Sequence, residues 1–429
     1  MGPSDLRQLH RDHPKRYPFL LQSTAPGGSL GRYDILFAFP GETLVAGDHT
    51  KFLDALDERW AAARTGEQDS ILPFNGGWFL YLGYELAAEV EPGLTLRPDE
   101  VLPAAFAVRC PTALIYDHDT ADCHLVCESP DCVDREQLSA DIAAIDRNRP
   151  VTAASVLSVV EEDSPAFTDA VIQVKDYIAA GDVYQSNLSR QWTAEVSPET
   201  DANDIYAALC RSNPGPFAGI ARWQDIEIIS SSPERLLQVD NGIASTRPIA
   251  GTRPRSQDAG ADEDLSTELF AHPKERAEHV MLIDLGRNDL GRVCKAGTVE
   301  VDELMVLESY AHVHHIVSNV QGRIRDDVTP GQAIAAVFPG GTITGCPKVS
   351  CMEIISELEQ GPRGAYTGSF GYLNRDGSMD LNILIRTMVK NGNCVTFRAG
   401  SGIVADSDPT AELDETRAKA EGMLRAIAR

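Results

Sequence analysis

The sequence lacks the features of a membrane protein or a nucleic-acid-binding protein. No apolar run approaches the roughly 18 residues that a membrane-spanning helix needs. Basic residues are few, since 38 Lys and Arg stand against 64 Asp and Glu and give 429 residues a net charge of −26. This balance argues against binding nucleic acid or an anionic membrane through bulk electrostatics. Because Met1–Leu6 has no basic stretch leading into an apolar one, we expect no secretory signal and predict a cytoplasmic protein.

The sequence also lacks the cysteine pattern of a disulfide-bonded protein. Nine cysteines, an odd number spread over a long chain, favour free thiols over a disulfide framework. Cys123, His124 and Cys127 lie in the second strand of an expected hairpin over residues 113–127, where successive side chains point to opposite faces. We therefore predict no zinc site there. No cysteine stands in the Gly-x-Cys-x-Gly turn that a glutaminase nucleophile needs, so the chain is not expected to release ammonia from glutamine.

The hydrophobic pattern that is present predicts an α+β protein with mostly antiparallel strands and helices outside them. Residues 1–16 are polar and are predicted to be loose. Periodicity and capping signals predict helices over residues 52–63, 166–180, 262–284, 329–338, 349–359 and 409–427. The predicted strands include residues 33–39, 78–82, 183–192 and 380–389, with hairpin turns at 374–377 and 390–393.

Two predicted helices each carry a pair of glutamates three residues apart, Glu275 with Glu278 and Glu412 with Glu415. This spacing places both carboxylates of a pair on one helix face. Four converging carboxylates would need a cation between them, and an all-oxygen set suits Mg²⁺. Spacing alone leaves open the alternative that these are solvated glutamates of an acidic protein.

Three glycine-rich segments, at residues 249–252, 340–348 and 399–402, could bring backbone amides close to an anion or could be purely structural. On the predicted strand 183–192, Gln185 and Asn187 share a polar face that is either exposed or the wall of a polar cavity. Arg386, on the predicted strand 380–389, is either solvated or placed to bind a carboxylate through both arms of its guanidinium group.

Taken together, these motifs resemble the chorismate-using enzymes, a family that includes anthranilate synthase component I, aminodeoxychorismate synthase component I, isochorismate synthase and salicylate synthase. The resemblance is strong from about Phe167 onward and is traceable from Pro18. The matching strings lie at residues 181–185, 232–235, 247–253, 278–290, 315–318, 345–348, 385–387 and 400–406. So many strings in one order make the resemblance specific.

The resemblance implies a layered fold of two antiparallel sheets with helices outside and the active site in the cleft between them. It divides the chain into an N-terminal region over residues 17–150 and a catalytic region over residues 165–429, intertwined in one unit. It also implies a set of site residues. The Mg²⁺ ligands would be Glu278 and Glu415, supported by Glu275 and Glu412; the substrate-binding groups Gly251, Thr252, Tyr366, Arg386, Gly400, Ser401, Gly402 and Lys419; and the catalytic residues Glu234, His315 and Gln185.

Within this family, Gln185 stands where the water-using enzymes resemble one another in carrying a lysine base. A neutral amide cannot deprotonate water, so ammonia is the expected nucleophile. Residues 181–188 and 338–345 resemble aminodeoxychorismate synthases more than anthranilate synthases. The leading interpretation is therefore amination of chorismate at C4, with ammonia supplied by a separate glutamine amidotransferase subunit.

Two departures keep other interpretations open. Ala250 stands where many aminodeoxychorismate synthases resemble one another in carrying a lysine, and anthranilate synthases share this alanine. Amination at C2 with loss of pyruvate is the alternative. Residues 20–23 resemble the tryptophan-binding motif of anthranilate synthases, but Gln22 replaces its glutamate. A silent regulatory subunit that binds chorismate or tryptophan is a third interpretation.

Overall fold

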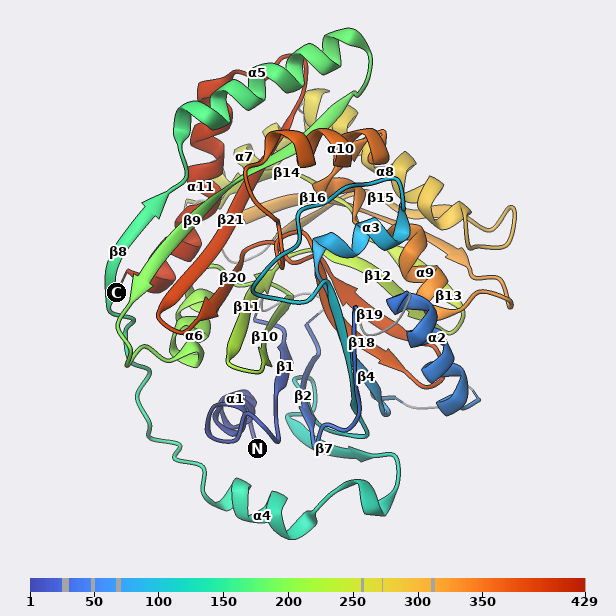
Figure 1. Cartoon of the computed structure of the whole chain (residues 1–429), viewed down its shortest axis with the longest axis vertical. Coiled ribbons are helices and arrows are strands. Elements are labelled where there is room, and N and C mark those ends of the chain that lie inside the picture. The colour runs from blue at the N-terminus through green and yellow to red at the C-terminus, as the bar shows by residue number, and fades with distance from the viewer. Residues whose placement is uncertain are drawn as a thin grey trace.

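The computed structural model describes residues 1–24, 31–47, 51–66, 71–255, 258–271, 273–309 and 313–428. In these residues two large antiparallel β-sheets form the centre of the molecule and helices surround them (Figure 1). This arrangement confirms the predicted α+β class. None of the described helices combines the length and the apolar character needed to cross a membrane.

The first sheet contains strands from both ends of the chain. In spatial order its strands are β17 (Gly345–Cys346), β9 (Gln185–Val196), β21 (Cys394–Ile403), β20 (Thr387–Asn391), β11 (Ile226–Ser232), β10 (Phe217–Trp223), β1 (Phe19–Gln22), β2 (Tyr33–Ala38), β6 (Thr112–Asp117) and β7 (Asp122–Cys127). A further strand, β8 (Val156–Glu161), pairs with β9. The pairing of β6 with β7 confirms the hairpin predicted over residues 113–127.

The second sheet also mixes early and late strands. In spatial order they are β14 (Ile249–Pro254), β16 (Val313–Arg323), β13 (Ile243–Thr246), β12 (Arg235–Asp240), β19 (Met379–Asn382), β18 (Ser369–Asn374), β4 (Gly77–Leu82), β5 (Ala105–Cys110) and β3 (Thr43–Val45), with β15 (Glu300–Ser309) paired to β16. Because β1 pairs with β10 and β4 pairs with β18, strands of the N-terminal region lie inside both sheets.

The helices cover the outer faces of the sheets. They are α1 (Pro3–Asp12), α2 (Phe52–Ala63), α3 (Ala87–Val90), α4 (Arg135–Ala143), α5 (Ser164–Ala180), α6 (Ala202–Ser212), α7 (Ala259–Ala271), α8 (Pro273–Gly291), α9 (Pro330–Val337), α10 (Lys348–Leu358) and α11 (Pro409–Ile427). Short 3₁₀ turns lie at Tyr84–Leu86, Pro130–Cys132 and Gly341–Ile343. Helices α6 and α11 pack together beside β11 and β21, and α2 contacts α9 (Figure 1).

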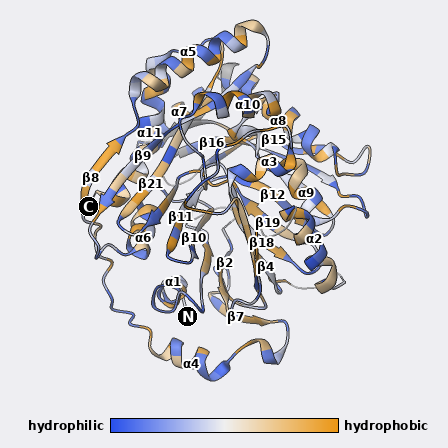
Figure 2. Cartoon of the chain, viewed as in Figure 1, coloured by the Kyte–Doolittle hydropathy of each residue, from blue (hydrophilic) through white to orange (hydrophobic). Residues whose placement is uncertain are grey.

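An aromatic core joins the two sheets where their faces meet. The ring of Phe19 in β1 stacks on Phe79 in β4 with centroids 3.9 Å apart, and Phe106 in β5 lies within 6.3 Å of both. Aromatic pairs of this kind contribute packing energy beyond the area that they bury. Figure 2 shows that α5 alternates polar and apolar residues, as a surface helix does.

Local signals predicted several helices closely. Helices α2 and α11 have the predicted bounds, and α5 ends at Gly181, whose φ of +86° favours glycine. Residues 262–284, predicted as helical, are helical wherever the structure describes them, in α7 and the first part of α8.

The N-terminal prediction was wrong, since residues 1–16 contain α1 rather than a loose segment. Leu6 and Leu9, three residues apart, form an apolar stripe that is fully buried against the first sheet. His10 is buried as well and its Nδ1 lies 2.7 Å from the carbonyl oxygen of Tyr17. Most other side chains of the segment are polar, which concealed this stripe in the sequence.

Candidate active site

The site is built where the chain crosses twice from one sheet to the other. The first crossing, between β11 and β12, contains Glu234, and the second, between β19 and β20, contains Arg386. The two crossings are hydrogen-bonded to each other: the amide of Ile383 donates to the carbonyl of Glu234 at 3.0 Å, and that of Ser231 to the carbonyl of Arg386 at 3.2 Å. Residues about 150 positions apart in the sequence are thereby held side by side.

The second crossing corrects the prediction of one strand over residues 380–389. The period-two pattern continues through this segment, but β19 ends at Asn382 and β20 begins at Thr387. Arg386 lies at the bend with a φ of +53°, a left-handed conformation that is uncommon for a residue with a side chain. Such conformations are often found at functional sites, where surrounding contacts stabilise them.

Glu234 has the properties of a general acid. Its side chain is 5 % exposed, and burial raises its pKa to about 7, although the nearby charges of Arg386 and Lys419 oppose the shift. Burial also lowers the pKa of Arg386 to about 10, against the influence of Glu234, so the guanidinium group remains charged at neutral pH. A protonated carboxyl and a partly buried cation can therefore coexist here.

A wall of polar groups, which we call the polar wall, lies on β9 and β21. The predicted glycines Gly400 and Gly402 leave room for side chains opposite: a Cβ on Gly400 would lie 2.7 Å from the Tyr366 hydroxyl and 2.9 Å from Oδ1 of Asn187. A Cβ on Gly402 would collide with the Gln185 amide. The structure thus brings Tyr366, Gln185 and the glycines together, as predicted.

Several buried oxygen atoms around this wall have no hydrogen-bond partner within the described part of the chain. They are Oε1 of Gln185, Oδ1 of Asn187 and Oγ of Ser401. Since buried polar groups are nearly always hydrogen-bonded, such atoms indicate where a polar ligand binds. Asn187 was not among the predicted site residues, and neither was Thr342, whose side chain interacts with Glu234 and opposes the rise of its pKa. Asn187 could have been found from the polar face of its strand, whereas Thr342 had only its glycine-rich neighbours as a signal.

Strand β14 places Gly251 beside the acidic helix α8. Gly251 has a φ of +69°, and a Cβ there would lie 2.9 Å from Oε2 of Glu275, so only glycine allows this approach. Across the strand pair, Nδ1 of His315 lies 3.4 Å from the carbonyl of Gly251. Burial and the charge of Arg386 lower the pKa of His315 to about 3, which keeps the imidazole neutral. Thr252 pairs with His315 in the backbone register, and its side chain lies outside the described set.

Lys419 on α11 contacts β21, the strand that contains Gly400 and Gly402. Its Nζ donates to the carbonyl of Gly400 at 2.9 Å and forms an ion pair with Glu415 at 2.7 Å. The predicted cation is therefore in contact with the glycine segment.

The four predicted metal ligands lie on two helices, Glu275 and Glu278 on α8 and Glu412 and Glu415 on α11. Within the described residues, no three His, Cys, Asp or Glu side chains are close enough together to hold a metal ion. Glu412 is 8 % exposed, and its Oε2 has no hydrogen-bond partner among the described residues. A buried carboxylate oxygen of this kind suits a cation, so the chemistry of the donor set fits Mg²⁺, and the ligand assignment stays a prediction.

A small cavity of about 30 Å³ lies beside Glu234. Thr342, Gly340 and Ile383 line it near the carboxyl group, and Asp289 lines it as well. A cavity of this size has room for a water molecule. A Cβ on Gly340 would lie 2.8 Å from Cδ1 of Ile383, so the glycine leaves room for a side chain of the second crossing.

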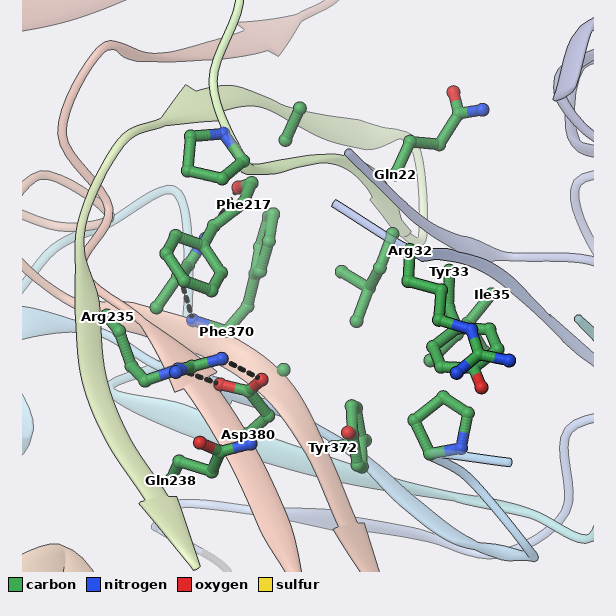
Figure 3. Close-up of a pocket in the computed structure, with 16 residues that line it drawn as sticks. Gln22, Arg32, Tyr33, Ile35, Phe217, Arg235, Gln238, Phe370, Tyr372 and Asp380 are labelled. Atoms are coloured by element: carbon green, nitrogen blue, oxygen red, sulfur yellow. Dashed lines mark hydrogen bonds and ion pairs between the residues drawn. The ribbon is translucent and has the colours of Figure 1, made fainter. Parts of the chain in front are cut away.

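A separate pocket of about 380 Å³ borders the N-terminal motif over residues 20–23 (Figure 3). Gln22 lies at its rim, and its amide donates to Asp34 at 2.8 Å. Arg235 and Asp380 form a two-bond ion pair on the opposite wall, with distances of 2.9 and 2.8 Å. The motif that resembles a tryptophan-binding segment therefore does line a cavity, together with Phe217.

Comparison with known proteins identifies the family. Residues 17–425 match the family model described as chorismate binding enzyme. The chain is 42 % identical over 359 residues to an anthranilate synthase component I-like protein of Synechocystis sp., covering 83 % of this chain and 73 % of that protein. It is 37 % identical over 449 residues to aminodeoxychorismate synthase component 1 of Bacillus subtilis, covering 99 % and 94 %.

A solved structure agrees with the fold. Anthranilate synthase component I from Streptococcus pneumoniae TIGR4 superposes with a TM-score of 0.83 at 31 % identity, covering 92 % of this chain and 93 % of that one. The chain belongs to the family of chorismate-binding enzymes, and within it to the group that is similar to both anthranilate synthases and aminodeoxychorismate synthases.

Proposed function

We propose that the chain replaces the C4 hydroxyl of chorismate with ammonia, giving 4-amino-4-deoxychorismate for p-aminobenzoate and folate synthesis. The observation that carries this proposal is Glu234, a buried carboxyl whose pKa of about 7 keeps much of it protonated at neutral pH. A hydroxyl group leaves poorly unless it is protonated, and a positioned carboxylic acid supplies that proton.

Substrate binding is assigned to the groups around this acid. Arg386 and Tyr366 hold the enolpyruvyl carboxylate, since a guanidinium group can bind a carboxylate through two hydrogen bonds. Ser401 and the backbone of Gly400 and Gly402 complete the anion site, with Lys419 adding positive charge. The backbone amides of residues 251–252 contribute at β14.

In the reaction, the lone pair of ammonia forms the C4–N bond while the C4–O bond breaks. The leaving oxygen takes the proton of Glu234 and departs as water. The new ammonium group then loses a proton, which the Glu234 carboxylate can accept, so the acid is regenerated. Neutral His315 can position the ring but cannot act as an acid, because its pKa lies near 3.

Magnesium fits the proposal through its ligands. Glu278 and Glu415, supported by Glu275 and Glu412, would hold Mg²⁺, which supplies positive charge for the ring carboxylate of chorismate. A dianionic substrate needs such a local reversal of field in a protein of net charge −26.

Amination at C4 is supported by the residues beside the acid. Gly340 stands where anthranilate synthases more often resemble one another in carrying alanine. Here it leaves space for the side chain of Ile383, whose backbone amide donates to the backbone carbonyl of Glu234. Gln185 has no basic group with which to activate water. The similarity to the Bacillus subtilis aminodeoxychorismate synthase component 1 extends over 99 % of the chain.

Amination at C2 with loss of pyruvate, the anthranilate synthase reaction, is the second candidate. Ala250 favours it. Many aminodeoxychorismate synthases resemble one another in carrying a lysine at this position, which attacks C2 before ammonia enters at C4. The side chain of Ala250 is buried in β14 and offers no such nucleophile. The anthranilate synthase relatives favour it as well. The third interpretation, a silent regulatory subunit, is disfavoured because Glu234, Glu278, Glu415 and Arg386 are all present.

A separate glutamine amidotransferase subunit is the proposed source of ammonia. The Bacillus subtilis and Streptococcus pneumoniae relatives are named as first components of their synthases. This chain also has no Gly-x-Cys-x-Gly turn with which to hydrolyse glutamine itself.

The nucleophile can be tested directly. The purified chain is incubated with chorismate and Mg²⁺, in parallel with ammonium or with sodium as the counter-ion, and chorismate is followed by chromatography. We expect chorismate to disappear only with ammonium. Formation of isochorismate in the sodium buffer would contradict the proposal, because it would show that water is the nucleophile.

A further inference from the structure

A buried cluster of charges lies next to the polar wall of β9 and β21. Its members are Arg363, Glu359, Arg398 and Ser189, and each of them is no more than 6 % exposed. Glu359 follows α10, whereas Arg398 and Ser189 belong to β21 and β9. We call this set the Arg363 cluster.

Glu359 holds both arginines of the cluster. Its carboxylate accepts from Nε and Nη2 of Arg363 at 3.0 and 2.6 Å, and from Nη2 of Arg398 at 3.1 Å. Ser189 adds hydrogen bonds from its amide and its hydroxyl, at 2.8 and 2.9 Å. Burial alone would raise the pKa of Glu359, but the two guanidinium groups hold it below its usual value. The carboxylate is therefore ionised and fully hydrogen-bonded.

Arg363 also contacts three elements that face the site. Its Nη2 donates to the carbonyl of Asn187 in β9 at 2.8 Å, and its Nη1 to the carbonyl of Ile343, next to Thr342, at 3.0 Å. Its guanidinium carbon lies 5.5 Å from the centroid of the Tyr366 ring and 4.9 Å from that of the Tyr84 ring. Arg398 makes none of these contacts: it bonds to Glu359, Ser189 and Gln191.

We infer that Arg363 is a positioning residue that fixes the Tyr366 ring, the Asn187 segment of β9 and the turn carrying Thr342 relative to one another. The planar guanidinium group suits this task, because it presents donors in a rigid fork while its face stacks on an aromatic ring. A lysine could keep the ion pair with Glu359 but could not make both carbonyl contacts and the stack. The inference rests on the proposed function, since it assumes that these three elements contact chorismate and ammonia.

The test compares Arg363→Lys with Arg398→Lys. Both variants keep a positive charge beside Glu359 in an equally buried place, so both should lower the melting temperature. Misplacement of reacting groups by about 1 Å can cost roughly 100-fold in rate. We therefore expect Arg363→Lys to lower kcat/KM for chorismate about 100-fold and to raise its KM about tenfold. Arg398→Lys should leave both constants within about twofold of wild type.

The KM separates positioning from stability. A merely structural loss reduces the fraction of active enzyme, which lowers apparent kcat and leaves KM unchanged. A folded Arg363→Lys variant with the wild-type KM would overturn the inference, as would an equal rise of KM in Arg398→Lys. A wild-type chain that makes no product from chorismate would instead contradict the proposed function, and this inference with it.

Should Arg363→Lys fail to fold, Glu359→Gln provides the second test. This change keeps the size of the side chain and removes the charge that anchors Arg363, without touching any group that faces the site. We expect a rise in the KM for chorismate smaller than tenfold but larger than in Arg398→Lys. A folded Glu359→Gln variant with wild-type KM would overturn the inference.

Discussion

At the scale of single residues, the chemistry depends on Glu234 and Arg386. Their charges influence each other, since each appears among the causes of the other's shifted pKa. Binding of an anionic substrate near Arg386 adds negative charge close to Glu234, which favours the protonated carboxyl further. The acid would thus be most fully protonated when the substrate is in place.

Replacing Glu234 by Gln should lower kcat at least 100-fold, the usual contribution of a general acid, and should change the affinity for chorismate little. Rates are measured at saturating ammonium, and affinity by calorimetry. Glu227→Gln is the matched control, because Glu227 is another largely buried carboxyl with a raised pKa, on β11 and ion-paired to Arg222. An active Glu234→Gln variant would exclude Glu234 as the acid.

The pH dependence follows from the same group. Because the protonated form of Glu234 is the active one and its pKa in the free protein is about 7, kcat/KM for chorismate should fall as pH rises above 7. The concentration of free ammonia must be held constant across the series, since deprotonation of ammonium acts in the opposite direction. A kcat/KM that stays level to pH 9 at constant free ammonia would argue against a titrating acid.

At the scale of elements, the two sheet crossings form the site. Ser232, at the end of β11, links them, since its hydroxyl donates to the carbonyl of Ile383 at 2.5 Å and accepts from the amide of Glu234 at 3.2 Å. The crossings are thus held together by side chains as well as by backbone.

Ser232→Ala should lower the free energy of unfolding by about 1–3 kcal/mol, because it leaves a buried carbonyl and a buried amide without this partner. It should also lower kcat by roughly tenfold through displacement of Glu234. Ser230→Ala is the control: Ser230 is buried on the same strand, two residues earlier, and bonds to Thr387. Equal kcat values in both variants would mean that Ser232 does not position the acid.

Elements with local end signals could be predicted from the sequence. Helix α11 begins after Asp408, whose side chain caps it, and α5 ends at Gly181, so both ends were visible. The break between β19 and β20 could not be predicted, since apolar residues continue to alternate through Ile383 and Ile385. Only pairing with distant strands of two different sheets ends the one strand and begins the other.

The candidate site likewise contains residues that could be predicted from the sequence and contacts that could not. Glu234, Tyr366 and Arg386 could be named from family motifs; the structure places Glu234 close to Arg386 and Tyr366 beside Gly400. The Arg363 cluster could not be predicted, because Arg363 reaches Asn187, 176 positions away, through its side chain. No pattern of period two or 3.6 reports such a contact.

At the scale of the whole molecule, the negative net charge explains why the proposed reaction would need a bound cation. A net charge of −26 repels a dianionic substrate. The positive charges of Arg386 and Lys419 offset only part of this repulsion. Without a cation, the four glutamates on α8 and α11 would add to the repulsion. With Mg²⁺ bound between them, they would form a binding site for the anionic substrate.

Glu278→Gln should therefore abolish turnover and weaken Mg²⁺ binding at least tenfold, as measured by calorimetry in the absence of substrate. Chelation of Mg²⁺ by EDTA should likewise weaken chorismate binding to the wild type. Glu421→Gln is the control on α11, since Glu421 is exposed and pairs with Arg425. Full activity in EDTA-treated, Mg²⁺-free buffer would contradict the metal assignment.

The most direct test of the central claim is the identity of the product. The chain is incubated with chorismate, Mg²⁺ and ammonium at mildly alkaline pH, and the products are separated by chromatography and identified by mass. We predict 4-amino-4-deoxychorismate, which the corresponding lyase converts to p-aminobenzoate. Anthranilate together with pyruvate would contradict C4 amination and show that Ala250 marks an enzyme that aminates at C2.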